Sequence, residues 1–363
     1  MNRYSRHIAL REIGRAGQDR LAKARVLVVG AGGLGCPVLQ YLTAAGIGAL
    51  GIVDPDIIEE SNLQRQILFG TATLGQNKAL AAQKRLTDLN PNIDIRAYPE
   101  RVTPRNALAF CSDWDVVVDG TDNLASRYLI NDASLITGKP LVYAAVYKFE
   151  GQLAVFNYRN GPSYRCLYPV PPRAAAVPDC SESGVLGVLP GLMGVMQANE
   201  VLKSILNLGT VLSGKVLFYN ALSAKVTTVT LHRSEVEIDK VLANRDAFQH
   251  DSAGLYGGRP VDEISVESAF RKRGAQWIDI REMGERPRVK KPAVTRIPFS
   301  QLMGRIDEID SQREKIIFCQ TGARSQKAIT LLSQRPYFDN CYSVKGGAWA
   351  ISAYEKRRGD ERA

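Results

Sequence analysis

The sequence predicts an α/β protein with a doubly wound, mostly parallel sheet and a second, smaller α/β domain. An apolar run at 26–29 is followed by a glycine-rich turn and a helical pattern. Strand-like and helical stretches then alternate through short connections, and the alternation starts again after residue 258. This order is typical of parallel sheets, because each crossover between parallel strands needs a connecting segment that is usually a helix.

Length and composition bound the class of protein. With 363 residues the chain is long for one core, and two domains are expected. No apolar run reaches the roughly 20 residues that span a bilayer, so no membrane partner is expected. The N-terminus, MNRYSRHIALREIG, lacks the apolar stretch of a signal peptide, and six scattered Cys favour reduced thiols. A cytoplasmic protein is therefore expected.

The net charge of +10 is uneven along the chain. Residues 259–363 hold 21 of the 47 Lys and Arg residues and 14 of the 37 Asp and Glu residues. A basic surface attracts anions or an acidic partner. Since no RNA- or DNA-binding motif accompanies it, we expect a solvated basic face and no nucleic-acid partner.

The first domain is predicted to span residues 1–235. Its first 25 residues are polar, with apolar residues at loosely helical spacing, which predicts helix. Apolar and β-branched runs predict strands at 26–29, 50–53, 93–97, 116–118, 141–145 and 152–156. Helical patterns predict helices at 35–45 and 78–89.

The remaining segments predict a loop, a linker and a second domain. Residues 160–183 are rich in Pro, Ala and Ser without periodicity, which indicates a long functional loop. An apolar helix at 184–206 and strands within 215–231 complete the first domain. Residues 236–258 are polar and end in AGLYGG, which predicts a linker. The second domain, 259–363, is predicted to contain strands at 277–280, 316–319 and 341–344, a helix at 325–332 and a C-terminal helix.

Glycines after the first strand indicate a nucleotide site. VLVVGAGGLG places Gly30, Gly32 and Gly35 in a Gly-x-Gly-x-x-Gly turn that opens a helix, whose N-terminal N–H groups favour phosphate. Alone, this motif fits any dinucleotide or nucleotide binder. Polar groups at the ends of later strands make it more specific.

Those polar groups are acidic and basic residues in a fixed order. Asp54 ends the second strand, about 20 residues beyond the turn, where a carboxylate accepts from ribose hydroxyls. Arg65 and Lys78 can neutralise a triphosphate. Asp122 follows the strand at 116–118 and can hold Mg²⁺. Each is commonly a surface or turn residue when taken alone, as is Asp56, but their joint order makes coincidence a poor explanation.

The motifs GAGGLG, SNLQRQ, GQNK and DGTDN resemble the MoeB/ThiF family of ATP-dependent activators of small ubiquitin-like sulfur-carrier proteins. Residues 1–232 follow the family pattern, including RYSRHI at the N-terminus. The resemblance implies a Rossmann-like activating-enzyme domain that binds ATP and Mg²⁺, with Asp122 at the metal. The nucleotide-binding residues expected are Gly30, Gly32, Gly33, Gly35, Asp54, Asp56, Asn62, Arg65, Gln66, Lys78, Asp122 and Asn123.

The family resemblance also implies a reaction. The C-terminal Gly carboxylate of a carrier ending in Gly-Gly attacks the α-phosphate of ATP and forms an acyl-adenylate. Positioning and electrostatics suffice for this in-line displacement. Arg65 and Lys78 would assist catalysis, and Arg6 would reach into the neighbouring subunit's site, which implies a homodimer.

The sequence departs from the family at the zinc-binding cysteines. Many members hold a structural zinc with two Cys-x-x-Cys pairs. Here Cys166 is followed by Leu167, Tyr168 and Pro169, and no Cys lies between 181 and 318. Since four thiolates are usual for such a site, no zinc is expected. YRCLYP followed by VPDCSESGVLG resembles the MoeZ-type subgroup, which also lacks the second pair.

Two cysteines are candidates for sulfur chemistry. Cys180 lies in the long loop and could take the carrier's acyl group or form a mixed disulfide, although a harmless loop cysteine is an equal alternative. Cys319 ends a strand in IIFCQTGARS, before a tight turn and a helix. Backbone N–H groups of such a turn stabilise an anionic thiolate or persulfide, and Arg324 adds positive charge. Cys36, Cys111 and Cys341 are expected to pack as small hydrophobic residues.

The Cys319 loop resembles the active loop of a rhodanese, Cys-x-x-Gly-x-Arg-Ser. WIDIRE, RIPFSQL and SVKGGAWAISAY extend the resemblance over 259–357, with Asp279 and Arg281 as structural residues. A phosphatase loop is the main alternative. It has five residues between its Cys and Arg, whereas four intervene here, which favours sulfane sulfur.

Together the two resemblances imply adenylation of a sulfur carrier followed by sulfur transfer from a Cys319 persulfide. The persulfide would be loaded from thiosulfate or a cysteine desulfurase. The product would be the carrier thiocarboxylate, with Cys180 as a resolving thiol.

Alternatives remain open at this point. The carrier could serve tRNA thiolation or protein modification, or the adenylated acid could be a small molecule with the rhodanese-like domain in an accessory role. A NAD-dependent oxidoreductase and a non-enzymatic scaffold fit the sequence less well.

Overall fold

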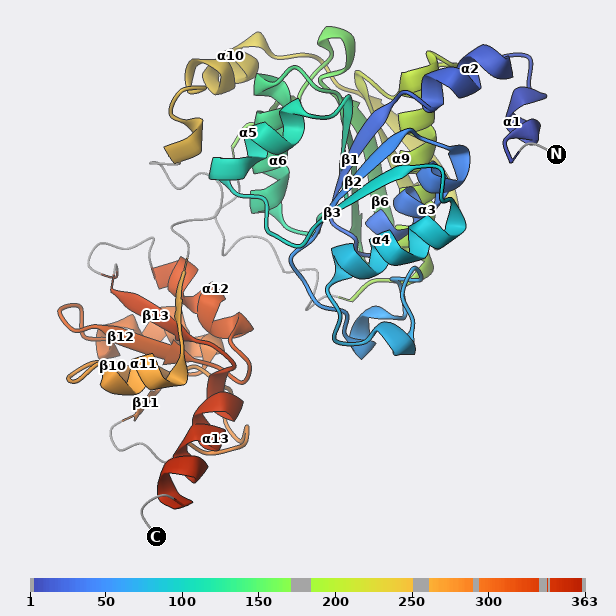
Figure 1. Ribbon diagram of the computed structural model, residues 1–363. Coiled ribbons are helices and arrows are strands. Elements are labelled where there is room, and N and C mark those ends of the chain that lie inside the picture. Colours follow the sequence, from blue (N-terminus) through green and yellow to red (C-terminus); the bar gives the residue numbers. More distant parts are fainter. Residues whose placement is uncertain are drawn as a thin grey trace. The chain divides into compact units, whose positions relative to one another are not determined.

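The computed structural model describes residues 3–170, 184–250, 261–289, 294–332, 338 and 340–360. The chain divides into two compact units, Met1–Tyr256 and Gly257–Ala363 (Figure 1). Cys180 lies outside the described residues. No helix in the described part of the chain combines the length and apolarity needed to cross a bilayer.

The first unit is built on an eight-stranded sheet in the order β3-β2-β1-β4-β5-β6-β7-β8. The pairs from β3 to β5 are parallel, and β6, β7 and β8 extend the sheet antiparallel. The predicted doubly wound, mostly parallel sheet is therefore confirmed. The strands are β1 (Arg25–Val29), β2 (Ala49–Val53), β3 (Asp94–Tyr98), β4 (Val116–Asp119), β5 (Leu141–Tyr147), β6 (Glu150–Phe156), β7 (Lys215–Asn220) and β8 (Lys225–Thr230).

Helices cover both faces of this sheet, because the strands are apolar on both sides. Val26 and Val28 of β1 join a core with α2, α3, α4 and α9, whereas Leu27 and Val29 join a core with α5, α6 and α10. The helices are α1 (Ser5–Ile8), α2 (Gly14–Leu21), α3 (Gly35–Ala45), α4 (Lys78–Leu89), α5 (Pro104–Ser112), α6 (Leu124–Ile136), α7 (Tyr164–Leu167), α9 (Val188–Leu206) and α10 (Glu235–Ala243). Short 3-10 turns are η1 (Glu60–Asn62), η2 (Thr71–Thr73), η3 (Tyr158–Asn160) and η5 (Phe248–His250).

Sequence patterns missed α5 and α6, although each has a local start signal. Thr103 precedes Pro104, a favoured first helical residue, and its N–H donates to Asn106 Oδ1 at 2.7 Å. Asn123 caps α6 by accepting from the Ser126 N–H at 2.9 Å. Nine of the thirteen residues of α6 are buried, and four of these are polar or charged: Arg127, Asn131, Asp132 and Ser134. Apolar spacing alone therefore does not reveal which face of this helix is buried.

The predicted linker at 236–258 is corrected in its first part. Residues from 235 form α10, which Ser234 caps by accepting from the Glu237 N–H at 3.4 Å. Ile238, Val241 and Phe248 are buried, and the last two join the core beneath α6. Those apolar residues attach the segment up to 250 to the first unit.

The second unit holds a five-stranded parallel sheet in the order β11-β10-β12-β13-β9. Its strands are β9 (Asp262–Ile264), β10 (Gln276–Asp279), β11 (Val294–Arg296), β12 (Lys315–Phe318) and β13 (Cys341–Val344). Ile317 packs in a core with α12, and Ile316 packs in a core with α11 and α13. The helical segments are α11 (Val266–Arg271), the 3-10 segment η6 (Phe299–Glu308), α12 (Ala323–Leu332) and α13 (Gly347–Asp360).

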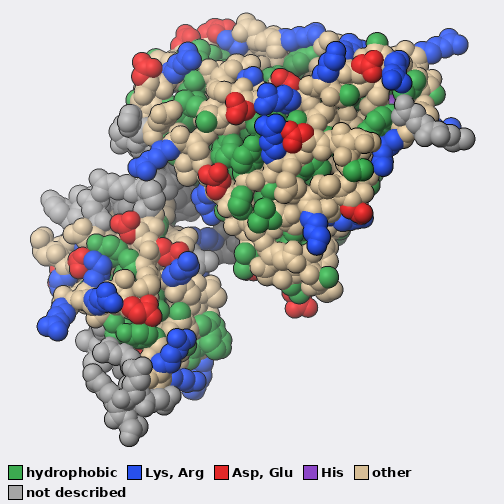
Figure 2. All heavy atoms as spheres, in the orientation of Figure 1, with side chains coloured by type: hydrophobic (Ala, Val, Ile, Leu, Met, Phe, Trp, Pro, Cys, Tyr) green, Lys and Arg blue, Asp and Glu red, His purple; other side chains and the backbone are tan. Residues whose placement is uncertain are grey.

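Charged side chains of both signs share the surface. Figure 2 shows Lys and Arg interspersed with Asp and Glu on the visible face of each unit. On that face the basic excess does not gather into a patch of one sign.

The glycine turn after β1 sets how closely α3 approaches the sheet. A Cβ atom on Gly35 would lie 1.9 Å from the Gly30 carbonyl oxygen, and one on Gly30, at φ +97°, would lie 2.8 Å from the Gly120 carbonyl oxygen. The backbones of β1, α3 and the β4–α6 turn therefore meet without intervening side chains.

We expect Gly35→Ala to lower the free energy of unfolding by about 3 kcal/mol, because α3 must move away from β1. Helix propensity alone predicts the opposite, a gain of about 1 kcal/mol. Gly32→Ala is the matched control, since its Cβ would meet only Gln66 Nε2 at 3.9 Å. Urea unfolding of both variants measures the difference, and equal midpoints would contradict the steric argument.

Candidate active sites

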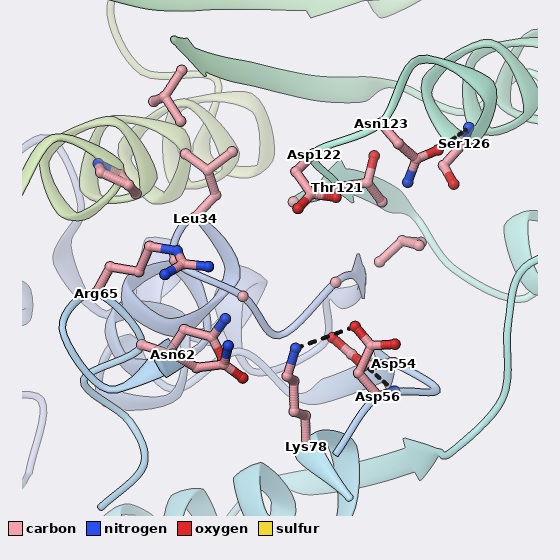
Figure 3. A pocket seen from close by; sticks show the side chains of 18 of the residues that line it. Leu34, Asp54, Asp56, Asn62, Arg65, Lys78, Thr121, Asp122, Asn123 and Ser126 are labelled. Carbon is pink, nitrogen blue, oxygen red and sulfur yellow. Dashed lines mark hydrogen bonds and ion pairs between the residues drawn. The ribbon is translucent and has the colours of Figure 1, made fainter. Parts of the chain in front are cut away.

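A cavity of about 730 Å³ opens in the first unit where β1, β2, β4 and β5 end (Figure 3). The sheet order reverses direction at β1, with β2 on one side and β4 on the other. In doubly wound sheets, ligands bind outside the carboxyl ends of the strands at such a switch point. Most residues that line the cavity come from the turns that follow these strands and from η1, α4, α6 and α9, and the segments at 100–102 and 184–185 complete it.

The floor of the cavity is the glycine turn. Gly30, Gly32 and Gly33 line it, and α3 begins directly behind them. A Cβ on Gly33 would lie 3.0 Å from Pro190 Cβ, so a larger residue would crowd the turn. Gly35 does not line the cavity but permits the close packing beneath it. The N-terminal N–H groups of α3 favour an anion at this place.

Asp54, at the end of β2, is 5% exposed and is held by the backbone. Its Oδ2 accepts from the Ala31 N–H at 2.7 Å, and its Oδ1 accepts from the Asp56 N–H at 2.9 Å. Burial raises the pKa of this carboxyl above its ordinary value, while Lys78 opposes the rise. Each oxygen keeps a lone pair that can accept from a hydroxyl in the cavity.

Lys78 opens α4 with its side chain nearly buried. Its Nζ lies 3.2 Å from Asp56 Oδ2, and both groups line the cavity (Figure 3). Asn77 caps α4 by accepting from the Leu80 N–H at 3.1 Å and donates to the Asp54 and Asp56 carbonyls. The local capping thus fixes where the ammonium group points.

The SNLQRQ segment forms a second wall around η1. Asn62 Oδ1 accepts from the Glu59 N–H at 3.2 Å, and Arg65 Nη1 donates to the Ser61 carbonyl at 3.2 Å. Gln66 is 3% exposed, and its Oε1 has no hydrogen-bond partner within the described residues. A buried acceptor on a cavity wall is suited to a ligand or a water molecule.

Another wall of the cavity is formed by the turn that follows β4. Asp122 is exposed and lies across the cavity from Lys78 and Asp56, beside Thr121 and Asn123 (Figure 3). Because Asn123 Oδ1 caps α6, its amide nitrogen is the group left for the cavity.

Sequence patterns missed two residues at this wall. Asp119 is fully buried with Oδ1 accepting from the Thr121 hydroxyl at 2.6 Å, and burial raises its pKa although Arg127 opposes this. Arg127 lines the cavity and donates to the Thr121 carbonyl at 3.4 Å. Asp119 ends the run VVVD, which was a signal of the same kind as Asp54.

The structure therefore brings most of the predicted nucleotide residues to one cavity. Its lining includes Gly30, Gly32, Gly33, Asp54, Asp56, Asn62, Arg65, Gln66, Lys78, Asp122 and Asn123. Arg6 lies on α1 and is exposed, and it is not part of this lining. Within the described residues, no group of three or more His, Cys, Asp or Glu side chains could share a metal ion.

Cys319 lies in the second unit at the end of β12, in a turn closed by its own backbone. The residue is 1% exposed, and its Sγ accepts from the Gly322 N–H at 3.1 Å. Ser325 Oγ lies 3.8 Å from the same sulfur and donates to the Gly322 carbonyl at 2.8 Å. Gly322 has φ +117°, which favours glycine there. This geometry suits a thiolate or an added sulfur.

Arg324, expected to add positive charge to the loop, is paired with a carboxylate. Its Nη1 lies 2.7 Å from Glu285 Oε1 and its Nη2 lies 2.5 Å from Glu285 Oε2. The hydrogen bonds from Arg324 lower the pKa of Glu285. No motif near Arg324 indicates this partner, which lies 39 residues away in the chain.

Asp279 and Arg281 form the buried ion pair beside the loop. Arg281 Nη2 lies 2.7 Å from Asp279 Oδ2, and Nη1 donates to the Pro287 carbonyl at 2.8 Å and to Gln320 Oε1 at 3.2 Å. The pair thereby positions the residue after Cys319.

Residues 4–238 match the ThiF family model. The chain belongs to the ThiF family. It is 51% identical over 239 residues to the sulfur carrier protein adenylyltransferase of Thermus thermophilus, covering 64% of this chain and 88% of the relative.

Longer relatives include both units. The probable adenylyltransferase/sulfurtransferase MoeZ of Mycobacterium tuberculosis is 37% identical, covering 96% of this chain and 92% of the relative. The adenylyltransferase and sulfurtransferase MOCS3 of Sus scrofa is 38% identical, covering 96% and 85%. The resemblance to the MoeB/ThiF family and its MoeZ-type subgroup is confirmed.

Solved structures support the fold. E. coli MccB with ATP has a TM-score of 0.57 and 22% identity, covering 65% of this chain and 73% of that chain. At this identity the likeness concerns the arrangement of the sheet and helices alone.

We expect Cys36 and Cys111 to resist alkylation at pH 8 in the folded protein, because burial raises the pKa of each thiol to about 12. Iodoacetamide treatment followed by peptide mass spectrometry measures this. Both thiols should react after denaturation, which is the control. Rapid modification of either one in the native protein would contradict the buried environment.

Proposed function

We propose that the first unit uses ATP to adenylate the C-terminal Gly of a small ubiquitin-like sulfur-carrier protein. The second unit then supplies sulfur from a Cys319 persulfide, which makes the carrier thiocarboxylate. The observation that carries this proposal is the cavity that gathers the glycine turn, Asp54, Lys78 and Asp122 in a chain that also contains the Cys319 loop. Relatives named for both activities, each covered over most of its length, support it.

ATP fits the cavity as its substrate. The glycine turn and the α3 N-terminus accept phosphates, and Asp54 accepts from ribose hydroxyls. Arg65 and Lys78 balance the phosphate charge, and Asn62 and Gln66 support the same wall. Gln66 Oε1, which is buried and unpartnered within the described residues, offers an acceptor for a hydroxyl or a water molecule.

Mg²⁺ fits the exposed carboxylate of Asp122. This hard cation takes one or two carboxylates with substrate phosphates and water, and it neutralises phosphate charge when bound. Asn123 holds the start of α6 and so fixes the turn on which Asp122 lies. Asp122 would be one carboxylate ligand, and Mg²⁺ usually takes only one or two carboxylates from a protein.

The adenylation step needs no covalent enzyme intermediate. A carboxylate oxygen of the carrier's terminal Gly attacks the α-phosphorus, the bond to the β-phosphate oxygen breaks, and pyrophosphate leaves. Arg65 and Lys78 stabilise the charge that develops on the phosphates. Arg6 acts in the site of a second subunit of a homodimer.

The sulfur step uses the second unit. Thiosulfate or a cysteine desulfurase loads Cys319, and the terminal sulfur of the persulfide attacks the acyl carbon and displaces AMP. A second thiol, proposed as Cys180, then attacks Cys319 Sγ, which breaks the sulfur–sulfur bond, releases the thiocarboxylate and forms a Cys180–Cys319 disulfide. An external thiol reductant returns both cysteines to thiols before the next cycle. Holding both units in one chain raises their effective concentration for each other.

Intact mass of candidate Gly-Gly carriers tests the whole proposal, after incubation with the full-length protein, Mg-ATP and thiosulfate. A gain that corresponds to replacement of the terminal hydroxyl by a thiol supports both activities. A carrier that gains only AMP supports the first unit and removes thiosulfate as the donor. No change in any carrier would sink the proposed substrate class.

We expect Cys319→Ala to retain carrier-dependent exchange of pyrophosphate into ATP and to lose thiocarboxylate formation by at least about 100-fold, because only the nucleophile is removed. Cys341→Ala, at a buried thiol on the neighbouring strand, is the control. Loss of exchange in Cys319→Ala, with the control active, would contradict the division of work between the units.

We expect Asp122→Ala to reduce pyrophosphate exchange by about 100-fold or more, because the metal loses its carboxylate ligand. Asp88→Ala is the matched control, since Asp88 is exposed and forms a surface ion pair with Arg85. Exchange rates at a series of Mg²⁺ concentrations give the measurement. An Asp122→Ala enzyme with unchanged rate and Mg²⁺ dependence would remove Asp122 from this role.

A further inference from the structure

Glu285 is a carboxylate fixed beside the Cys319 loop. Its Oε1 accepts from the Glu282 N–H at 2.8 Å and from Arg324 at 2.7 Å, while Oε2 accepts from Arg324 at 2.5 Å. Glu282 is itself anchored to Ser300 by bonds of 3.2 and 3.1 Å. Glu285 therefore holds its position from the protein side and does not merely follow the arginine.

The pair is of the strong kind. Both side chains are about one-third exposed or less, and the contact is bidentate. Charge-assisted bidentate pairs are stronger and more directional than single surface contacts. The carboxylate occupies one edge of the guanidinium, which is the edge that a planar oxyanion would otherwise use.

The second guanidinium that contacts the loop is also matched. Arg281, which reaches Gln320, is bound on two nitrogens by Asp279. Arg324 in the loop and Arg281 beside it are thus both paired with a carboxylate. This leaves less positive charge for a ligand than the sequence loop Cys-x-x-Gly-x-Arg-Ser implies.

We propose that Glu285 determines the sulfur donor: it neutralises Arg324 and so disfavours the dianion thiosulfate relative to donors whose leaving group carries less charge. This inference rests on the proposed role of Cys319 as the thiol that forms a persulfide. Glu285 touches no reacting atom and acts through Arg324, so it is a positioning residue.

The chemistry of loading shows why charge matters. The Cys319 thiolate attacks the outer sulfur of thiosulfate, the sulfur–sulfur bond breaks, and sulfite leaves with the electron pair and two negative charges. Methanethiosulfonate reacts in the same way but releases methanesulfinate with one negative charge. In both cases cyanide then removes the outer sulfur as thiocyanate and restores the thiolate. A neutralised guanidinium penalises the dianion more, because stabilisation scales with the charge that develops.

The test compares these two donors on the full-length protein and on Glu285→Gln, with thiocyanate as the readout. We expect kcat/KM for thiosulfate to rise by about 10-fold in the variant and that for methanethiosulfonate by about 3-fold, since the Coulomb energy with the dianion is about twice that with the monoanion. Glu308→Gln is the matched control. It breaks another bidentate Arg–Glu pair, with Arg305 in η6, and should leave both values unchanged.

Other outcomes overturn the proposal. Equal changes for both donors, or a fall for both, would show that Glu285 only orients Arg324. No gain with thiosulfate, while methanethiosulfonate still places a persulfide on Cys319 by peptide mass spectrometry, would reject donor selection and leave the proposed function standing. If neither donor loads Cys319 in any variant, the sulfurtransferase role itself fails.

Discussion

The close approach of three backbone segments is the constraint on which the first unit depends. Gly30, Gly35 and Gly120 let β1, α3 and the turn after β4 come together with no side chain between them. This contact lies at the point where the sheet order reverses. Because no side chain covers the turn there, its backbone N–H groups can reach a ligand in the cavity. Asp54 depends on it directly, because its carboxylate is held by the N–H of Ala31 in the same turn.

The site in the second unit is also formed by a backbone turn, but this turn surrounds the Cys319 thiol. There the backbone curls around one sulfur atom, and Gly322 provides the N–H that points at it. Buried charges sit next to both sites: Asp119 under the nucleotide cavity, and the pair of Asp279 and Arg281 beside the thiol. These groups touch the turns and not the cavity centres. Asp119 Oδ1 accepts from the Thr121 N–H and hydroxyl, and Asp279 Oδ1 accepts from the Arg281 N–H, so both residues hold the backbone of a turn in place. Asp279 is bonded on both oxygens, whereas Asp119 Oδ2 has no hydrogen-bond partner within the described residues.

Local patterns predicted much of this arrangement. The helix at 78–89 and the strand at 341–344 have the bounds expected from apolar spacing and flanking signals. Strand ends predicted Asp54 and Asp122, since parallel strands finish at one edge. Long-range pairing was not predictable in this way. Nothing near Arg324 in the sequence indicates Glu285, and the burial of α10 depends on partners in α6 and α7 that are distant along the chain. The helix α6 was also missed, because four of its nine buried residues are polar or charged and apolar spacing does not reveal their burial.

The ion pair of Lys78 and Asp56 has a consequence for how the cavity meets a polyanion. The ammonium group is already matched by a carboxylate in the structure, and the Lys78 side chain is 8% exposed. A phosphate that reaches Lys78 exchanges one anionic partner for another, and the displaced carboxylate, which is more than half exposed, returns to water. Phosphate binding at Lys78 therefore releases fewer counterions than the number of basic residues in the cavity would imply. Nucleotide affinity should accordingly vary with ionic strength less steeply than for a site whose lysine is unpaired.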